Sequence, residues 1–90
     1  MKIIIYVDFK SSKFNKDFSL SNALLEEHNV LLVTNTRQLG NAIENYDILL
    51  LGYSIDIDIT LNYNKPVLNL LDYMSIESVQ EKLKNIHIGN

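Results

Sequence analysis

The chain has 90 residues, of which 47% are hydrophobic and 21% are charged, with eight basic against eleven acidic side chains. This length accommodates one domain with one hydrophobic core, and the composition is that of a folded rather than a disordered protein. The net charge of −3 and the absence of cysteine exclude a dedicated basic nucleic-acid binder, disulfide bridges, thiolate metal sites and thiol nucleophiles.

The first predicted elements are a strand and a helix. Lys2–Val7 contains a continuous apolar run rich in isoleucine, which is typical of a strand buried on both faces. Ser19 or a near neighbour is placed to cap a helix that runs through Leu20 and Leu24 to Glu27.

A second strand, a second helix and a third strand follow. Asn29–Val33 is predicted to be another buried strand, and Asp47–Leu51 a third one that ends at Gly52. Between these strands Thr36 opens a helix. Its apolar stripe recurs at helical spacing and consists of Leu39, Ala42, Ile43 and Tyr46.

A fourth strand and a last helix complete the predicted pattern. Pro66–Leu71 is expected to be a strand, because proline is tolerated at the first strand position. Ser75 is expected to cap the last helix, with Glu77 in its first turn and Lys82 and Lys84 in its last turn, as the helix dipole favours. The expected buried face consists of Ile76, Val79, Leu83 and Ile86.

The segment Ser54–Tyr63 fits two structures. Its apolar and polar residues alternate at every position, which favours a strand that runs antiparallel between the third and fourth strands. Ile55, Ile59 and Tyr63 also form one stripe of a helix, and a parallel crossover needs a connection of about this length. Both alternatives stay open, with a slight preference for a short helix.

Short apolar strands separated by amphipathic helices indicate βαβ units and a parallel sheet. Right-handed crossovers then place helices on both faces of that sheet. We therefore expect residues 1–90 to form a single α/β domain, a small Rossmann-like three-layer sandwich with a four-stranded, mainly parallel sheet. The expected strand order is 2-1-3-4.

The ligand site of such a sheet lies beyond the carboxyl ends of its strands, here between the loops after the first and third strands. The first loop, residues 8–17, holds three of the eight basic residues and two hydroxyls before a helix N-terminus, which favours an anion. The loop has no glycine and matches no phosphate-binding fingerprint, so an ordinary solvated loop is the alternative. The candidate ligand-binding residues are Asp8, Lys10, Ser11, Ser12, Lys13, Ser54 and Asp56.

No catalytic residue, metal ligand or cofactor is predicted. Asp8 lacks the acidic neighbours of a phosphoacceptor aspartate and is expected to be a cap or loop residue. Asp56 and Asp58 could share a divalent ion on a strand, but their alternation with isoleucine is more typical of the solvated face of an edge strand. His28 and His87 have no serine or acid at the spacing of a catalytic triad.

The order of elements and three local patterns resemble the IIB components of the lactose/cellobiose class of the sugar phosphotransferase system. The patterns are Lys2–Val7 as a first strand, Asp47–Gly52 as a third strand with its glycine, and Lys65–Tyr73 before a final helix. That family carries a phosphorylated cysteine at the end of the first strand. This chain has no cysteine and has Asp8 there, so the resemblance implies a fold kept for binding or regulation rather than for phosphoryl transfer.

Two functional hypotheses follow. The first is a non-catalytic, cytoplasmic regulatory module that acts by protein interaction or ligand sensing. Its expected partner is another protein, a second copy in a homodimer, or a phosphorylated small molecule. Nucleic acid is not expected because the net charge is −3. A membrane is not expected because the apolar run after Lys2 is too short for a signal peptide or a membrane span. The alternative is a minimal phosphate- or nucleotide-binding enzyme domain that uses the crevice after the first and third strands.

Overall fold

The computed structural model describes residues 1–55, 65–72 and 75–86. Within these ranges four strands form one parallel sheet in the order β2-β1-β3-β4. The strands are β1 (Lys2–Tyr6), β2 (Asn29–Val33), β3 (Ile48–Leu51) and β4 (Val67–Asn69). The predicted α/β class, the parallel pairing and the strand order are therefore confirmed.

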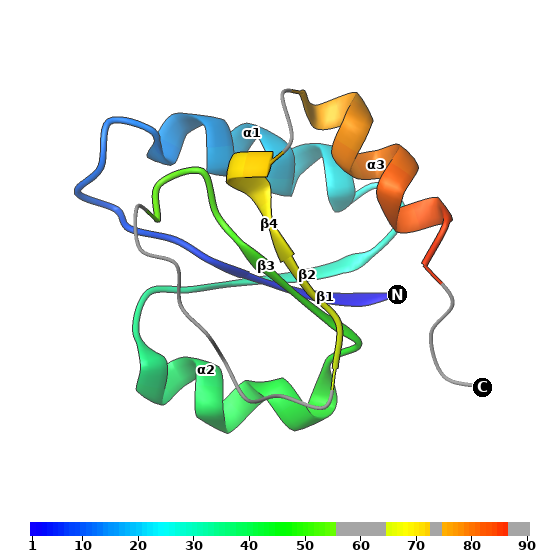
Figure 1. Ribbon diagram of the computed structural model, residues 1–90. Helices are drawn as coiled ribbons and strands as arrows, with labels where there is room; N and C mark the ends of the chain where they lie inside the picture. Colours follow the sequence, from blue (N-terminus) through cyan, green and yellow to red (C-terminus); the bar gives the residue numbers. More distant parts are fainter. Residues whose placement is uncertain (56–64, 73–74, 87–90) are drawn as a thin grey trace.

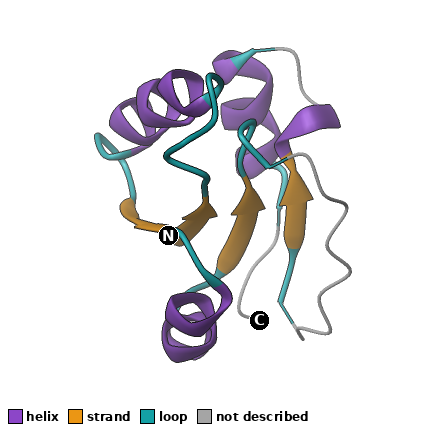
Figure 2. Ribbon diagram, turned by 90° about the vertical axis from the view of Figure 1, so that its left-hand side faces the viewer, coloured by secondary structure: helices purple, strands orange, loops and turns teal. Residues whose placement is uncertain are grey.

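Helices cover both faces of the sheet. Helices α1 (Phe14–Leu24) and α3 (Ile76–Lys84) lie on one face and α2 (Thr36–Ala42) lies on the other (Figures 1 and 2). Two short 3₁₀ helices, η1 (Ile43–Asn45) and η2 (Leu70–Asp72), follow α2 and β4. None of the helices in the described ranges is long and apolar enough to span a bilayer.

The central strands supply side chains to two cores, because successive residues of a strand point to opposite faces. Ile3 and Ile5 of β1 pack in the core under α1 and α3, whereas Ile4 packs in the core under α2. All four residues of β3 are buried. Two-sided burial therefore explains the continuous apolar runs that predicted these strands.

β2 differs from the prediction in its burial. Its bounds are the expected Asn29–Val33, but only Val33 is fully buried, and Leu31 is 36% exposed. The reason is its position at the edge of the sheet, where β1 is its one partner among the described strands. An apolar run alone does not distinguish an edge strand from a central one.

The predicted start of α1 was wrong. The helix begins at Phe14, and Ser19, expected to cap it, lies inside, where its hydroxyl donates to the carbonyl of Asn15 at 3.0 Å. The preceding residue, Lys13, makes no side-chain capping bond. The loop after β1 is therefore shorter than the expected range of 8–17, and its last four residues belong to the helix.

The later elements agree more closely with the sequence. β4 is shorter than predicted, since the Asn69 side chain accepts the N–H of Leu71 at 3.1 Å and the chain turns into η2. Ser75 caps α3 as predicted, in a reciprocal capping box with Ser78. Residues 56–63 of the ambiguous segment lie outside the described ranges; its first two residues, Ser54 and Ile55, are buried.

Lys65 connects the start of β4 to the end of the α2–η1 segment. Its ammonium donates to the carbonyl oxygens of Ile43 at 3.1 Å, Glu44 at 2.7 Å and Tyr46 at 2.6 Å. Carbonyls at a helix C-terminus lack intrahelical partners and carry partial negative charge, so a cation stabilises them.

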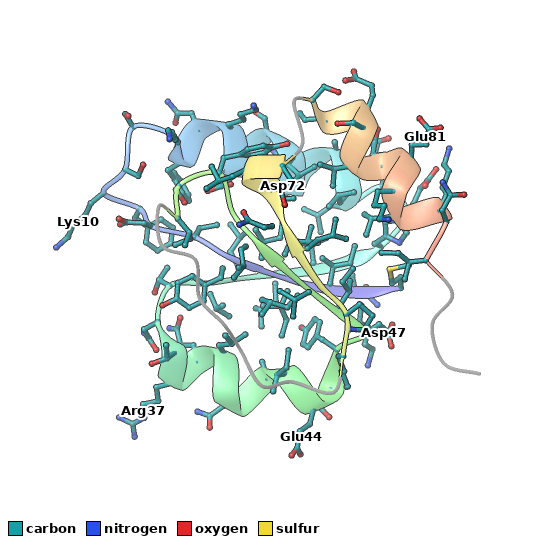
Figure 3. All side chains as sticks on the ribbon, in the orientation of Figure 1. Lys10, Arg37, Glu44, Asp47, Asp72 and Glu81 are labelled. Atoms are coloured by element: carbon teal, nitrogen blue, oxygen red, sulfur yellow. The ribbon has the colours of Figure 1, made fainter. Side chains whose placement is uncertain are left out.

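We expect Lys65→Met to lower the free energy of unfolding by about 1–3 kcal/mol, because it keeps the apolar stem and removes all three bonds. Urea denaturation measures this change. The control is Lys10→Met: Lys10 points away from the body of the protein (Figure 3), and its replacement should change stability by less than about 0.5 kcal/mol. Equal losses in the two variants would contradict the assigned role of Lys65.

Candidate functional site

The carboxylate of Asp17 is buried between the first turn of α1 and the turn that follows β3. Asp17 has 0% of its surface exposed. The N–H of Tyr53 donates to its Oδ1 at 2.6 Å, and the N–H of Ser54 donates to its Oδ2 at 3.1 Å. The Ser54 hydroxyl also donates to Oδ2. Three donors therefore hold the N-terminus of α1 against the carboxyl end of β3.

Gly52 permits this close approach. Its N–H donates to the carbonyl of Tyr6 at 2.8 Å, which extends the pairing between β1 and β3 by one residue. A Cβ at this position would lie 2.7 Å from both the Tyr6 oxygen and Oδ1 of Asp17. A side chain at position 52 would therefore displace the carboxylate or the strand.

Asp8 completes the network from the side of β1. Its N–H donates to the Ser54 hydroxyl at 2.8 Å, and its own Oδ1 accepts the N–H of Lys10 at 2.9 Å. Its carbonyl accepts the N–H of Ser11 at 3.1 Å. Asp8 therefore occupies the position of a loop residue that closes a turn, and Ser54 links it to Asp17.

Burial and charge shift two pKa values at this site. Removal from water raises the pKa of Asp17 above its ordinary value, although its three hydrogen bonds and the charge of Lys16 act in the opposite direction. The pKa of Tyr53 is also raised, first by burial and then by the negative charge of Asp17. Tyr53 therefore keeps its proton at neutral pH, and its hydroxyl remains a hydrogen-bond donor.

A pocket of about 450 Å³ lies beside this network. It is lined by Ser12, Lys13, Asn15, Lys16, Tyr53 and Leu71, and we call it the α1 pocket. Tyr53 is only 3% exposed, and its buried hydroxyl has no hydrogen-bond partner among the described residues. The ammonium of Lys16 lies 4.1 Å from the centroid of the Tyr53 ring, in a cation–π contact.

The structure distributes the predicted site residues over three places. Ser12 and Lys13 line the α1 pocket. Asp8 and Ser54 lie behind it in the hydrogen-bond network, and the Ser11 hydroxyl accepts the N–H of Lys13 at 3.2 Å. Lys10 points outward (Figure 3). Asp56, and with it the Asp56–Asp58 pair, lies outside the described residues.

The sequence analysis did not single out Asn15, Lys16, Asp17 or Leu71, and its candidate ligand-binding residues did not include Tyr53. One signal for Asp17 was present, because it falls at helical spacing with Leu20 and Leu24 and so puts an acid on the buried face of the helix.

The histidine within the described residues lies away from this site. His28 follows α1 at the opposite end of that helix, with its N–H bonded to the carbonyl of Leu24 at 2.9 Å and its Nδ1 buried without a partner within residues 1–55, 65–72 and 75–86. No group of three His, Asp or Glu side chains in the described ranges is arranged to hold a metal ion.

Comparison of this chain with protein-family models, curated proteins and solved structures finds no match. The inference of function therefore depends on the residues and geometry of the α1 pocket.

The two glycines at positions 52 and 40 form a matched pair for testing the Asp17 network. We expect Gly52→Ala to lower the free energy of unfolding by about 1–3 kcal/mol or more, because its methyl group overlaps the Asp17 carboxylate and the Tyr6 carbonyl. Gly40 lies within α2, and nothing is within 4 Å of a Cβ there. Gly40→Ala should therefore raise stability by about 0.5–1 kcal/mol. Urea denaturation of both variants checks these opposite signs.

The raised pKa of Asp17 predicts an unusual pH dependence. The folded state binds this proton more tightly than the unfolded state does. As the pH falls from neutrality toward the ordinary aspartate pKa of about 4, Asp17 therefore adds to the free energy of unfolding, and the gain ends once the unfolded chain is protonated too.

We expect acidification to raise the free energy of unfolding of the natural chain relative to that of the Asp17→Asn variant. The shift should be about 1.4 kcal/mol for each unit by which the pKa is raised. Denaturation curves at neutral and mildly acidic pH measure the difference, and ¹³C NMR of the Asp17 carboxyl measures its titration directly. A shift in the opposite direction would mean that the three donors outweigh burial.

Proposed function

We propose that this protein is a non-catalytic ligand-sensing module that binds a small phosphorylated molecule in the α1 pocket. The observation that carries the proposal is Tyr53, which lines the pocket and whose buried hydroxyl has no partner among the described residues. A buried donor without an acceptor costs free energy, so such groups in native proteins usually have a role. The hydroxyl is closed off from solvent, so a ligand oxygen would supply the missing acceptor once the Tyr53 side chain shifts toward the pocket.

The chemistry around Tyr53 favours an anion. Lys13 and Lys16 bring two positive charges to the pocket, and Ser12 and Asn15 add neutral polar groups. The pocket also lies at the N-terminus of α1, where the partial positive charge of the helix dipole favours an anion.

The remaining wall of the pocket favours a phosphate attached to an organic body rather than the bare ion. Leu71 also lines it and is 47% exposed, so it offers an apolar surface to the rest of a ligand. The volume of about 450 Å³ falls within the range of small-molecule sites. A phosphorylated metabolite of modest size matches both features, and we place the protein in the cytoplasm with such ligands.

A binding role is favoured over catalysis by the state of the nearby reactive groups. The Ser54 hydroxyl donates to Asp17 and accepts from the N–H of Asp8, and both Asp17 oxygens already accept hydrogen bonds. These groups support the pocket wall rather than face a substrate. The resemblance to phosphotransferase IIB components agrees with this role, since Asp8 would repel a phosphoryl group where those proteins carry one.

Amide-resolved NMR titrations with inorganic phosphate, a sugar phosphate and a nucleotide, each with and without Mg²⁺, test the proposal. We expect shifts at residues 12–16 and at Tyr53, larger for an organic phosphate than for the bare ion. ³¹P spectra of the same samples should show no turnover. Silence of these amides at millimolar ligand, or hydrolysis of the ligand, would overturn the proposal.

Tyr53→Phe isolates the contribution of the hydroxyl. We expect unchanged or slightly higher stability without ligand, because the removed hydroxyl has no partner among the described residues, and about tenfold weaker binding of the phosphorylated ligand. The control is Tyr46→Phe, which changes a residue in the core under α2 and should leave affinity unaltered. If the Tyr53→Phe variant and the natural chain bind the ligand equally well, the Tyr53 hydroxyl does not contact the ligand.

A further inference from the structure

The two edge strands of the sheet, β2 and β4, differ in how they are protected against pairing with a strand of another chain. Edge strands of monomers are commonly short or interrupted by lysine, proline or a bulge, which prevents pairing with another chain. β4 has three residues and directly follows Pro66. β2 has five residues, no charge and no proline, and pairs with β1 in unbroken register from Asn29 to Val33. The outer side of β2 therefore carries none of these protections.

The backbone of β2 presents hydrogen-bonding groups on that outer side. The N–H of Asn29 donates to Met1 at 3.0 Å, and the carbonyl of Val33 accepts from Val7 at 2.9 Å, so both point toward β1. Backbone groups alternate in direction along a strand. The N–H and C=O groups of Val30 and Leu32 therefore point away from the sheet.

An apolar stripe on α1 lies beside this edge. At 100° per residue, Phe14, Phe18 and Leu25 fall within about 40° of one another around the helix axis. Phe18 is 50% exposed and Leu25 is 53% exposed. Lys16 and Ala23 lie on the opposite flank of the helix. Lys16 lines the α1 pocket together with Leu71 of η2, and Ala23 lines a second pocket together with Leu83 of α3. The stripe therefore lies on the flank of α1 that is turned away from α3, toward the β2 edge of the sheet.

We propose that the outer edge of β2 and the apolar stripe of α1, together the β2–α1 band, form the interface of a homodimer. The two copies of β2 pair antiparallel about a two-fold axis that passes beside Leu31. In this register Val30 and Leu32 of one copy form hydrogen-bonded pairs with Leu32 and Val30 of the other. The same rotation brings the two apolar stripes together on one face of a continuous eight-stranded sheet.

The band fits a second copy of this chain because it is complementary to itself. A two-fold interface places the same patch on both subunits, so charges on it would face like charges. The band has none: β2 is uncharged, and the two charged residues of α1, Lys16 and Asp17, lie outside the stripe. The two elements are each ~16 Å long from their rise per residue, so edge and stripe match in length. Leu31, 36% exposed, would be covered by its own copy.

A cysteine at position 31 tests the register directly. The chain contains no cysteine, so Leu31→Cys introduces its single thiol. Directly opposed residues of a non-hydrogen-bonded antiparallel pair have Cα atoms about 4.5 Å apart, within the range that a disulfide spans. We expect a disulfide-linked dimer under oxidised glutathione. The matched control is Val67→Cys on the other edge, at 39% exposure, and it should stay monomeric on a denaturing gel.

Sedimentation equilibrium over a concentration series tests the association without a thiol. The natural chain should fit a monomer–dimer equilibrium, and Leu31→Lys should weaken the dimer at least tenfold. Val67→Lys should not weaken it. Circular dichroism confirms that both variants fold, since both side chains are already exposed.

Three results would overturn the proposal: a monomer at every concentration, an assembly that grows beyond the dimer, or a dimer lost in Val67→Lys and kept in Leu31→Lys. None of these results depends on the α1 pocket, so the dimer and the ligand proposal succeed or fail separately.

Discussion

The buried carboxylate of Asp17 determines how the carboxyl end of the sheet is built. It accepts the N–H groups of two successive residues after β3 and the hydroxyl of Ser54, which in turn accepts the N–H of Asp8. One side chain thereby joins β1, β3 and α1. The α1 pocket lies beside this junction, so the positions of its cations and of Tyr53 depend on it.

Burying a carboxylate is costly, and the surroundings of Asp17 show how that cost is offset. Three directed donors replace the lost water, and the neighbouring Lys16 supplies positive charge. The result is a rigid arrangement, because every donor must keep its direction for the charge to remain satisfied. Rigidity at this place favours recognition of a ligand, since little conformational freedom remains to be lost on binding.

The strands could be predicted from sequence because their signals are local. The apolar runs of β1 and β3 reflect burial on both faces, and the handedness of parallel crossovers restricts the strand order. The cap of α3 was also predictable, since the Ser75 side chain accepts the N–H of Ser78, only three positions away. In each case the physical cause lies within a few residues of the element.

The start of α1 could not be predicted in this way. Its first turn is fixed by Asp17, whose partners lie 36 and 37 positions further along the chain, so no local capping pattern marks it. The pocket residues were missed for the same reason. Ser12 and Lys13 belong to the expected loop, but Lys16 enters the pocket wall only because the helix begins at Phe14.

The long separation between Asp17 and its donors has a consequence for synthesis of the protein on the ribosome. When α1 and β2 have left the ribosome, the turn at residues 52–54 has not yet emerged, so Asp17 lacks the three donors that it has in the folded protein. The central strand β1 likewise lacks β3 on one side. The β1–α1–β2 unit therefore cannot reach its final structure while it is being synthesised. Stable docking of α1 on the sheet has to wait until β3 and Ser54 have left the ribosome.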